Sequence, residues 1–318
     1  MTIVGHCIMK SYQRLLLFAL IVLGFTALLS PWAALTWDYI ITTRSGWESY
    51  RYSFGKIFDR FFMVSGIVLF FFFRRFLRLG PVDRLGLTPR AFAWRDIGRG
   101  FGLALASMAG LALIMSWLDV FEPYFRLSLT RSLERCASAI LAAAAAGFME
   151  EILFRGVIFK GLYEELGRTP AYLFAALFYS AIHFVKPADR AALGGLDAGT
   201  GIRYLTGSFQ PFLDLDQLFP GLLGLFLIGV VLCYAFERTG TLYLSIGLHA
   251  GWIFSLKMLR AFGDFRRNDL GWLFGSTDPK FVSGVVTWIG ILLVAVAVGR
   301  ITRRRARRFP DPPARAAA

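Results

Sequence analysis

Long apolar stretches separated by short polar connections dominate the hydrophobic pattern of this chain. Eight of them approach the roughly 20 residues that an α-helix needs to cross the apolar core of a bilayer. We place these spans at residues 15–35, 61–77, 98–118, 136–154, 170–186, 218–236, 241–259 and 281–299. The pattern therefore predicts an all-α fold, a polytopic membrane helical bundle with about eight transmembrane helices.

Three connections are longer than the rest. Residues 30–59 are rich in aromatic side chains, as is typical of chain lying at a membrane interface. Residues 187–217 form a glycine-rich loop and residues 263–280 a polar one. We therefore expect four parts: N-terminal transmembrane helices with an interfacial loop (1–135), a core that carries the polar motifs (136–260), a polar loop with the last transmembrane helix (261–300), and a basic disordered tail (301–318).

Composition and charge agree with a membrane protein. The 318 residues are 56% hydrophobic and 16% aromatic, too apolar for a soluble globular chain. The net charge of +14 comes from basic residues that flank the spans, with dense arginine blocks at 74–99 and 300–308. Basic residues of this kind stay on the cytoplasmic side and contact lipid headgroups. We expect an integral protein of a bacterial inner (plasma) membrane, with both termini cytoplasmic, membrane lipid as a partner and no nucleic acid.

A pair of glutamates ends the fourth apolar stretch, in the motif Glu150-Glu151-x3-Arg155. An ionisable side chain at the bilayer centre costs at least about 2.5–3.5 kcal/mol, so such residues mark functional sites by default. Glu151 and Arg155 are spaced i,i+4 and are predicted to form an ion pair on one helix face. Glu150 lies about 100° around the helix and needs a partner on another helix. Glu150 therefore suits a general base, whereas Glu151 and Arg155 also fit a purely structural pair.

Two of the three histidines, His183 and His249, also lie in apolar segments. A single histidine on an apolar helix face is more often a satisfied core residue than a ligand. Two of them beside an unpaired glutamate favour a site, because neutral imidazole can accept a proton, donate to an oxyanion or bind a metal.

The ordered motifs resemble the CPBP family, the CAAX-prenyl endoproteases and bacteriocin-processing proteases also called Abi proteins. The resemblance rests on Glu150-Glu151-x3-Arg155, on Tyr179-x3-His183, and on a Gly229-x7-Glu237-Arg238-Thr239-Gly240 approach to His249. It covers residues 140–255, just over a third of the chain, and implies a CAAX-protease-like catalytic core at 136–260.

Three positions depart from the family pattern. Tyr179 stands where the family usually has phenylalanine, and Cys233 where a small glycine is common. Ile253 replaces the asparagine that normally follows the last histidine by four residues. That asparagine is thought to help stabilise an oxyanion, and losing one such donor typically costs about 10²–10³ in rate. The indole N–H of Trp252 is a candidate substitute, although on an ideal helix it points about 100° away.

The resemblance implies an intramembrane endopeptidase that hydrolyses a peptide bond of a membrane-associated or lipidated protein substrate without a covalent intermediate. Glu150, as base, and His183 would activate a water, and His249 would hold the oxyanion. Glu151, Arg155, Tyr179 and Trp252 would support these three residues. No cofactor is expected; the alternative is a zinc ion bound by Glu150, His183 and His249.

A second function class remains open. An inactive or weak family member could serve as a bacteriocin-immunity protein or a membrane scaffold that uses the polar cluster for binding, and Ile253 is the residue that favours it. Ile253→Asn separates the cases: it raises the rate if a donor site is vacant, and otherwise buries an unpartnered amide.

Overall fold

A computed structural model gives the structure of residues 9–47, 50–77, 85–88, 91–185, 196–266, 270–275 and 281–303. The chain divides into two compact units, residues 1–79 with 183–215, and residues 80–182 with 216–318. The predicted all-α fold is confirmed, and each of the eight predicted spans coincides with a helix. By length and composition, the described residues contain four helices that can cross a membrane, Tyr12–Thr42, Ala93–Trp117, Leu129–Leu166 and Leu218–Thr239, and a shorter apolar helix, Val285–Ile301.

The first unit consists of helices that pack around buried aromatic residues. Its elements are α1 (Ser11–Thr42), α2 (Phe54–Leu77), α7 (Thr200–Gly207) and the short 3-10 helix η4 (Gln210–Leu213). The Tyr204 ring of α7 packs against Phe54 and Phe58 of α2, with ring centroids 5.3 and 4.8 Å apart. Ala34 of α1 completes this cluster. The aromatic packing explains why a helix forms within a segment that is rich in glycine.

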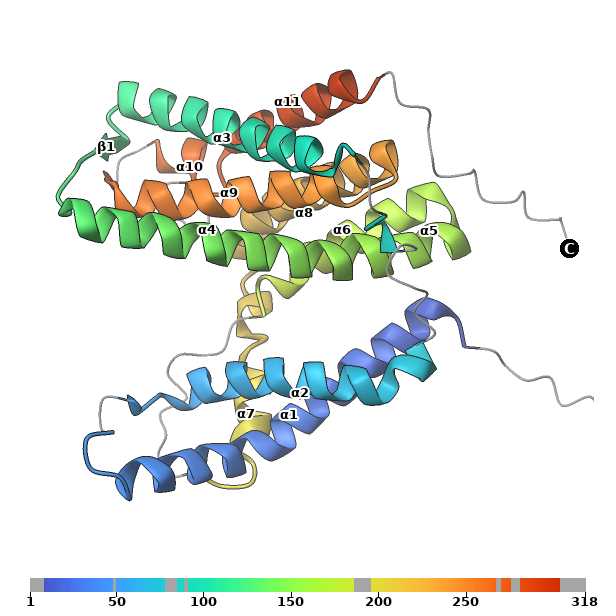
Figure 1. Cartoon of the computed structure of the whole chain (residues 1–318), viewed down its shortest axis with the longest axis vertical. Helices are drawn as coiled ribbons and strands as arrows, with labels where there is room; N and C mark the ends of the chain where they lie inside the picture. Colours follow the sequence, from blue (N-terminus) through green and yellow to red (C-terminus); the bar gives the residue numbers. More distant parts are fainter. Residues whose placement is uncertain are drawn as a thin grey trace, which may run out of the picture. The chain divides into compact units, whose positions relative to one another are not determined.

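The second unit contains the remaining elements (Figure 1). They are α3 (Ala93–Trp117), β1 (Phe121–Pro123), α4 (Leu129–Glu151), the π-helix η3 (Ile152–Phe159), α5 (Lys160–Leu166), α6 (Arg168–Ile182), α8 (Leu215–Thr239), α9 (Tyr243–Ala261), β2 (Gly263–Phe265), α10 (Gly271–Phe274) and α11 (Val285–Ile301). Strands β1 and β2 pair antiparallel, with Glu122 opposite Asp264. Helices α3, α8, α9 and α11 share an apolar core around Leu248.

Small residues let α9 pack closely between α3 and α4, as Figure 1 shows within this unit. A Cβ atom added to Gly100 of α3 would lie 2.4 Å from the Leu244 carbonyl oxygen of α9. On the other side, a Cβ added to Gly147 of α4 would lie 3.1 Å from the Ala250 nitrogen. Such contacts between small residues are the usual means of helix association in membranes. They bring the end of α4 and the middle of α9 together.

The turn between α8 and α9 fixes where α9 starts. Gly240 has φ +63°, in the left-handed region that glycine adopts without a steric penalty, and it follows Thr239, the last residue of α8. The Leu242 nitrogen then donates to the Gly86 carbonyl oxygen at 2.9 Å. The Glu237-to-Gly240 motif therefore contains the stop signal of α8, and His249 lies in the second turn of the helix that follows.

Three predicted connections are shorter than expected. Helix α1 continues to Thr42 and α2 begins at Phe54, so the interfacial loop is confined to residues 43–53. The glycine-rich 187–217 loop contains α7, η4 and the start of α8, and the polar 263–280 loop contains β2 and α10. In each case tertiary contacts order a segment of weak local pattern. The four-part division stays a prediction, and residues 304–318 of the predicted tail lie outside the described residues.

Candidate active site

Glu151 and Arg155 form the buried ion pair that their spacing predicts. The Arg155 Nη1 atom lies 2.6 Å from Glu151 Oε1, and both side chains are buried. The guanidinium carbon also lies 4.4 Å from the ring centroid of Tyr179, within cation–π distance. Two opposite charges in one contact can remain in a low-dielectric interior where neither could alone.

The helix that carries this pair widens directly after Glu151. Residues Ile152–Phe159 are π-helical, between α4 and α5. π-Helical turns are rare and occur often at functional sites. The i,i+4 argument assumed an ordinary α-helix, so the sequence analysis missed this element, although the ion pair that it predicted is present.

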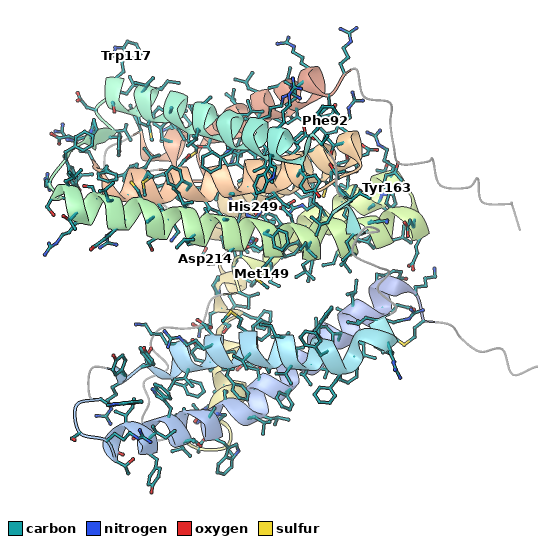
Figure 2. The ribbon with its side chains drawn as sticks, viewed as in Figure 1. Phe92, Trp117, Met149, Tyr163, Asp214 and His249 are labelled. Atoms are coloured by element: carbon teal, nitrogen blue, oxygen red, sulfur yellow. The ribbon has the colours of Figure 1, made fainter. Side chains whose placement is uncertain are left out.

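His249 lies on α9, beside α4 of the same unit (Figure 2). Its imidazole contacts Glu151 of α4. The Nδ1 atom is 2.8 Å from Glu151 Oε1, the oxygen that also accepts from Arg155. A carboxylate paired with arginine is a hydrogen-bond acceptor only, so Nδ1 must carry a proton. In the neutral imidazole the other nitrogen, Nε2, is then an acceptor, and only the doubly protonated ring can donate from Nε2.

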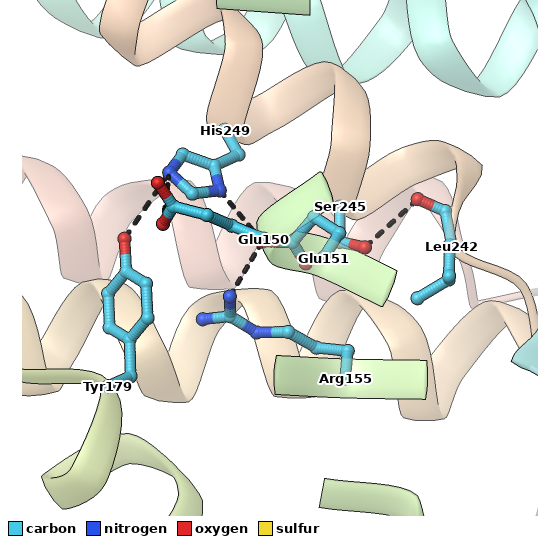
Figure 3. Close-up of polar contacts among 7 residues, drawn as sticks. All are labelled: Glu150, Glu151, Arg155, Tyr179, Leu242, Ser245 and His249. Atoms are coloured by element: carbon cyan, nitrogen blue, oxygen red, sulfur yellow. Dashed lines mark hydrogen bonds and ion pairs between the residues drawn. The ribbon is translucent and has the colours of Figure 1, made fainter. Parts of the chain in front are cut away.

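Two oxygen atoms approach His249 Nε2, as Figure 3 shows. The Tyr179 hydroxyl lies at 3.3 Å and Glu150 Oε2 at 3.7 Å. The neighbouring glutamates differ in access: the Glu150 side chain is 33% exposed and the Glu151 side chain 0%. The Glu150 side chain is therefore partly open to its surroundings, whereas Glu151 is enclosed by Arg155 and the imidazole.

Tyr179 is more closely involved in this cluster than the sequence indicated. Its ring is perpendicular to that of Phe154, with centroids 5.1 Å apart, and the tyrosine is 2% exposed. The spacing Tyr179-x3-His183 identified the position, but no sequence signal showed that the hydroxyl would meet His249.

The comparisons with known proteins agree with this geometry. Residues 131–255 match the family model described as type II CAAX prenyl endopeptidase Rce1-like. The matched segment is similar to this family over less than half of the chain. No curated protein and no solved structure matches the chain. The match agrees with the resemblance read from the motifs and, at the level of the family, supports a CAAX-type intramembrane protease.

The matched segment contains every residue that the sequence analysis selected for the site. Within the second unit, the matched segment brings together Glu150, Glu151, Arg155, Tyr179 and His249. Their catalytic roles stay predictions.

Two of the selected residues are not part of this cluster. His183 lies in the turn directly after α6 and is grouped with the first unit, so its place beside Glu150 and His249 stays a prediction. The Trp252 indole N–H donates to Ser107 Oγ of α3 at 3.1 Å. This hydrogen bond engages the donor that was considered as a substitute for the missing asparagine, and we assign Trp252 no oxyanion role.

Zinc, the alternative cofactor implied by the resemblance, requires three protein ligands in a catalytic site. Among the residues that the structure describes, no group of three or more His, Cys, Asp or Glu side chains is arranged to hold a metal ion. Glu150 Oε2 and His249 Nε2 offer two donors, and Glu151 is engaged by Arg155 and by Nδ1. The described residues do not assemble a zinc site, and no step proposed below uses a metal.

Proposed function

We propose that the protein is an intramembrane endopeptidase that hydrolyses a peptide bond of a membrane-associated or lipidated protein. One observation carries this proposal: the partly exposed side chain of Glu150 places its carboxylate 3.7 Å from an imidazole whose orientation Glu151 and Arg155 fix. The Rce1-like match supports the reaction class. The burial of the supporting pair in a membrane segment supports a site within the bilayer.

The chemistry assigns different tasks to the two glutamates. Glu150 removes a proton from a water molecule, and the resulting hydroxide oxygen attacks the carbonyl carbon of the scissile bond. The proton passes from Glu150 to Nε2 of the neutral His249 ring, 3.7 Å away, so that Nε2–H of the now doubly protonated ring donates a hydrogen bond to the developing oxyanion. Nε2 then returns this proton through Glu150 to the leaving nitrogen, the C–N bond breaks, and a carboxylic acid and an amine are released, with His249 neutral and Glu150 ionised again. Glu151 keeps Nδ1 protonated throughout, as second-sphere carboxylates commonly do for histidine.

His183 completes the proposed water-binding site. It follows Tyr179 by four residues, in the turn directly after α6. A nitrogen acceptor there would hold the water beside Glu150 before proton transfer. We assign His183 this orienting role, and Glu150 the role of base.

The test is hydrolysis by purified protein in proteoliposomes, with a farnesylated peptide ending in a C-a-a-X sequence, its unlipidated counterpart and a transmembrane peptide as substrates. Wild type should cleave at least one membrane-associated peptide, and Glu150→Gln should lower kcat at least about 10²-fold, because general-base catalysis contributes 10²–10⁴.

Glu164→Gln is the matched control, because Glu164 is an exposed glutamate on the same continuous helical segment. It should behave as wild type. Equal losses in both glutamine variants would refute the assignment of Glu150. Loss of activity with 1,10-phenanthroline, restored by zinc, would favour the metal alternative.

Ile253 favours the alternative that the protein only binds a partner, because it stands where the family pattern has an asparagine donor. If the protein only binds a partner, wild type should cleave none of the three peptides. Glu150→Gln should then leave the cellular phenotype of the gene intact. That pair of results would decide against an enzyme.

A further inference from the structure

The hydroxyl of Tyr179 is placed to donate a hydrogen bond in the site, whereas the ring alone would only fill space. It belongs to a buried residue of α6 and lies 3.3 Å from His249 Nε2, the nitrogen that also faces the Glu150 carboxylate. A phenylalanine would fill the same space between Phe154 and Arg155 without carrying a buried polar group that needs partners. The hydroxyl therefore calls for a functional reason.

The protonation pattern of His249 supplies this reason. Because Glu151 holds the proton on Nδ1, Nε2 of the neutral ring is a hydrogen-bond acceptor. In the contact between Tyr179 and Nε2, the Tyr179 O–H is therefore the donor. When the ring becomes doubly protonated, Nε2–H turns into a donor and the two groups no longer satisfy each other. The Tyr179 proton is then available for another acceptor at the same place.

Helix α6 is held firmly enough to keep this hydroxyl in place. Arg168 donates to both carboxylate oxygens of Glu237 on α8, at 2.8 and 3.1 Å, and the Tyr172 hydroxyl donates to Glu237 Oε2 at 2.7 Å. At the other end, Ser180 Oγ donates to the Leu222 carbonyl oxygen at 2.6 Å. Preorganised donors of this kind stabilise developing charge without a cost of reorganisation at the moment of reaction.

The geometry points to Tyr179 as a second oxyanion donor, alongside His249. Its hydroxyl supplies the hydrogen bond to the oxyanion that the apolar side chain of Ile253 cannot supply. This inference rests on the proposed function and deepens it. In the ground state the phenol donates to Nε2. In the tetrahedral intermediate both the phenol O–H and the imidazolium Nε2–H donate to the oxyanion, and no proton leaves the phenol.

The experiment compares Tyr179→Phe with wild type in proteoliposomes, on whichever of the three peptides wild type cleaves. We expect kcat to fall about 10²–10³-fold, the usual loss for one oxyanion donor, with KM within about threefold. A peptide aldehyde of the same sequence, whose hydrate imitates the tetrahedral intermediate, should lose affinity by a similar factor. The pH profile of kcat/KM should keep its shape.

Tyr172→Phe is the matched control, because it removes a partly buried tyrosine hydroxyl from the same helix, two turns away, where the partner is Glu237. It should lower stability but leave kcat of the folded protein within about threefold of wild type, because the two hydrogen bonds from Arg168 still hold α6 to Glu237.

Three results would overturn the inference: a kcat of Tyr179→Phe within threefold of wild type, equal losses in both phenylalanine variants, or a displaced pH profile with unchanged aldehyde affinity. The last result would make Tyr179 a positioning residue for His249. If wild type cleaves no peptide, the proposed function itself fails.

Discussion

At the scale of single residues, the contrast between Glu150 and Glu151 decides the chemistry. They are adjacent in sequence and carry the same functional group, yet one side chain is 33% exposed and the other is fully buried against Arg155. On a helix, neighbours point about 100° apart, so a single step along the chain changes the surroundings completely. In the proposed mechanism one carboxylate reacts, and its neighbour holds the histidine.

Arg155→Met tests how much the buried pair contributes. The substitution leaves Glu151 buried without a cation, and breaking one side of a buried pair costs about 3–5 kcal/mol. We expect a large loss of unfolding free energy in mixed detergent micelles, partly recovered in the double variant Glu151→Gln with Arg155→Met. Lys160→Met is the control: its i,i+4 partner Glu164 is exposed at 3.8 Å, so less than about 1 kcal/mol should be lost. Similar losses in both single variants would contradict this assignment.

Ile253→Asn tests whether a donor site beside His249 is vacant. Because Tyr179 already reaches His249 Nε2, we expect no gain in rate. Instead, the partly buried amide should cost roughly 1–3 kcal/mol of stability for want of a partner. Turnover and thermal unfolding measured on the same preparation check both effects. A rate increase approaching 10² would show a vacant site and would argue against a donor role for Tyr179.

At the scale of elements, close helix contacts position the site. Gly100 of α3 lies against the Leu244 carbonyl of α9, and Gly147 of α4 lies against Ala250, the residue next to His249. Backbone carbonyls cannot move aside as flexible side chains can, so the register of α9 depends on the absence of a Cβ atom at these positions.

Gly100→Ala therefore should be destabilising although alanine is the better helix former. Its Cβ would lie 2.4 Å from a backbone oxygen, so α3 and α9 must separate, at a cost of about 1–3 kcal/mol typical of overpacking. Hydrolysis should fall as His249 shifts. Gly98→Ala, two residues earlier with nothing within 4 Å, should be neutral or stabilising by up to about 1 kcal/mol. Thermal unfolding in detergent compares them, and equal behaviour would refute the packing argument.

The same elements show what the sequence could and could not predict. The spans and the Glu151–Arg155 pair follow from local periodicity, which acts over a few residues. The contacts of His249 with Glu151 and Tyr179 join residues 98 and 70 positions apart, and they depend on helix packing that no local pattern records. Helix α7 was missed because it is held by aromatic packing against α2 and not by the helix propensity of its own residues. The π-helical turn was missed because it has no local sequence pattern and is marked only by the buried ion pair beside it.

At the scale of the whole molecule, charge distribution determines orientation in the membrane. The two dense arginine blocks flank the second and third spans and follow the last one. Among eight spans, those positions face the same side as the amino terminus. Short segments rich in arginine are retained on the cytoplasmic side during membrane insertion, so this side is predicted to be the cytoplasm.

Cysteine labelling in intact cells tests that orientation. In a variant with Cys7, Cys136 and Cys233 replaced by serine, Arg315→Cys should resist a membrane-impermeant maleimide and react once the cells are opened. Ser45→Cys, in the connection between α1 and α2, is the opposite-side control and should react in intact cells. Labelling of position 315 from outside would reverse the predicted topology. It would also mean that six arginines between residues 300 and 308 had been translocated against the strongest orientation signal in the chain.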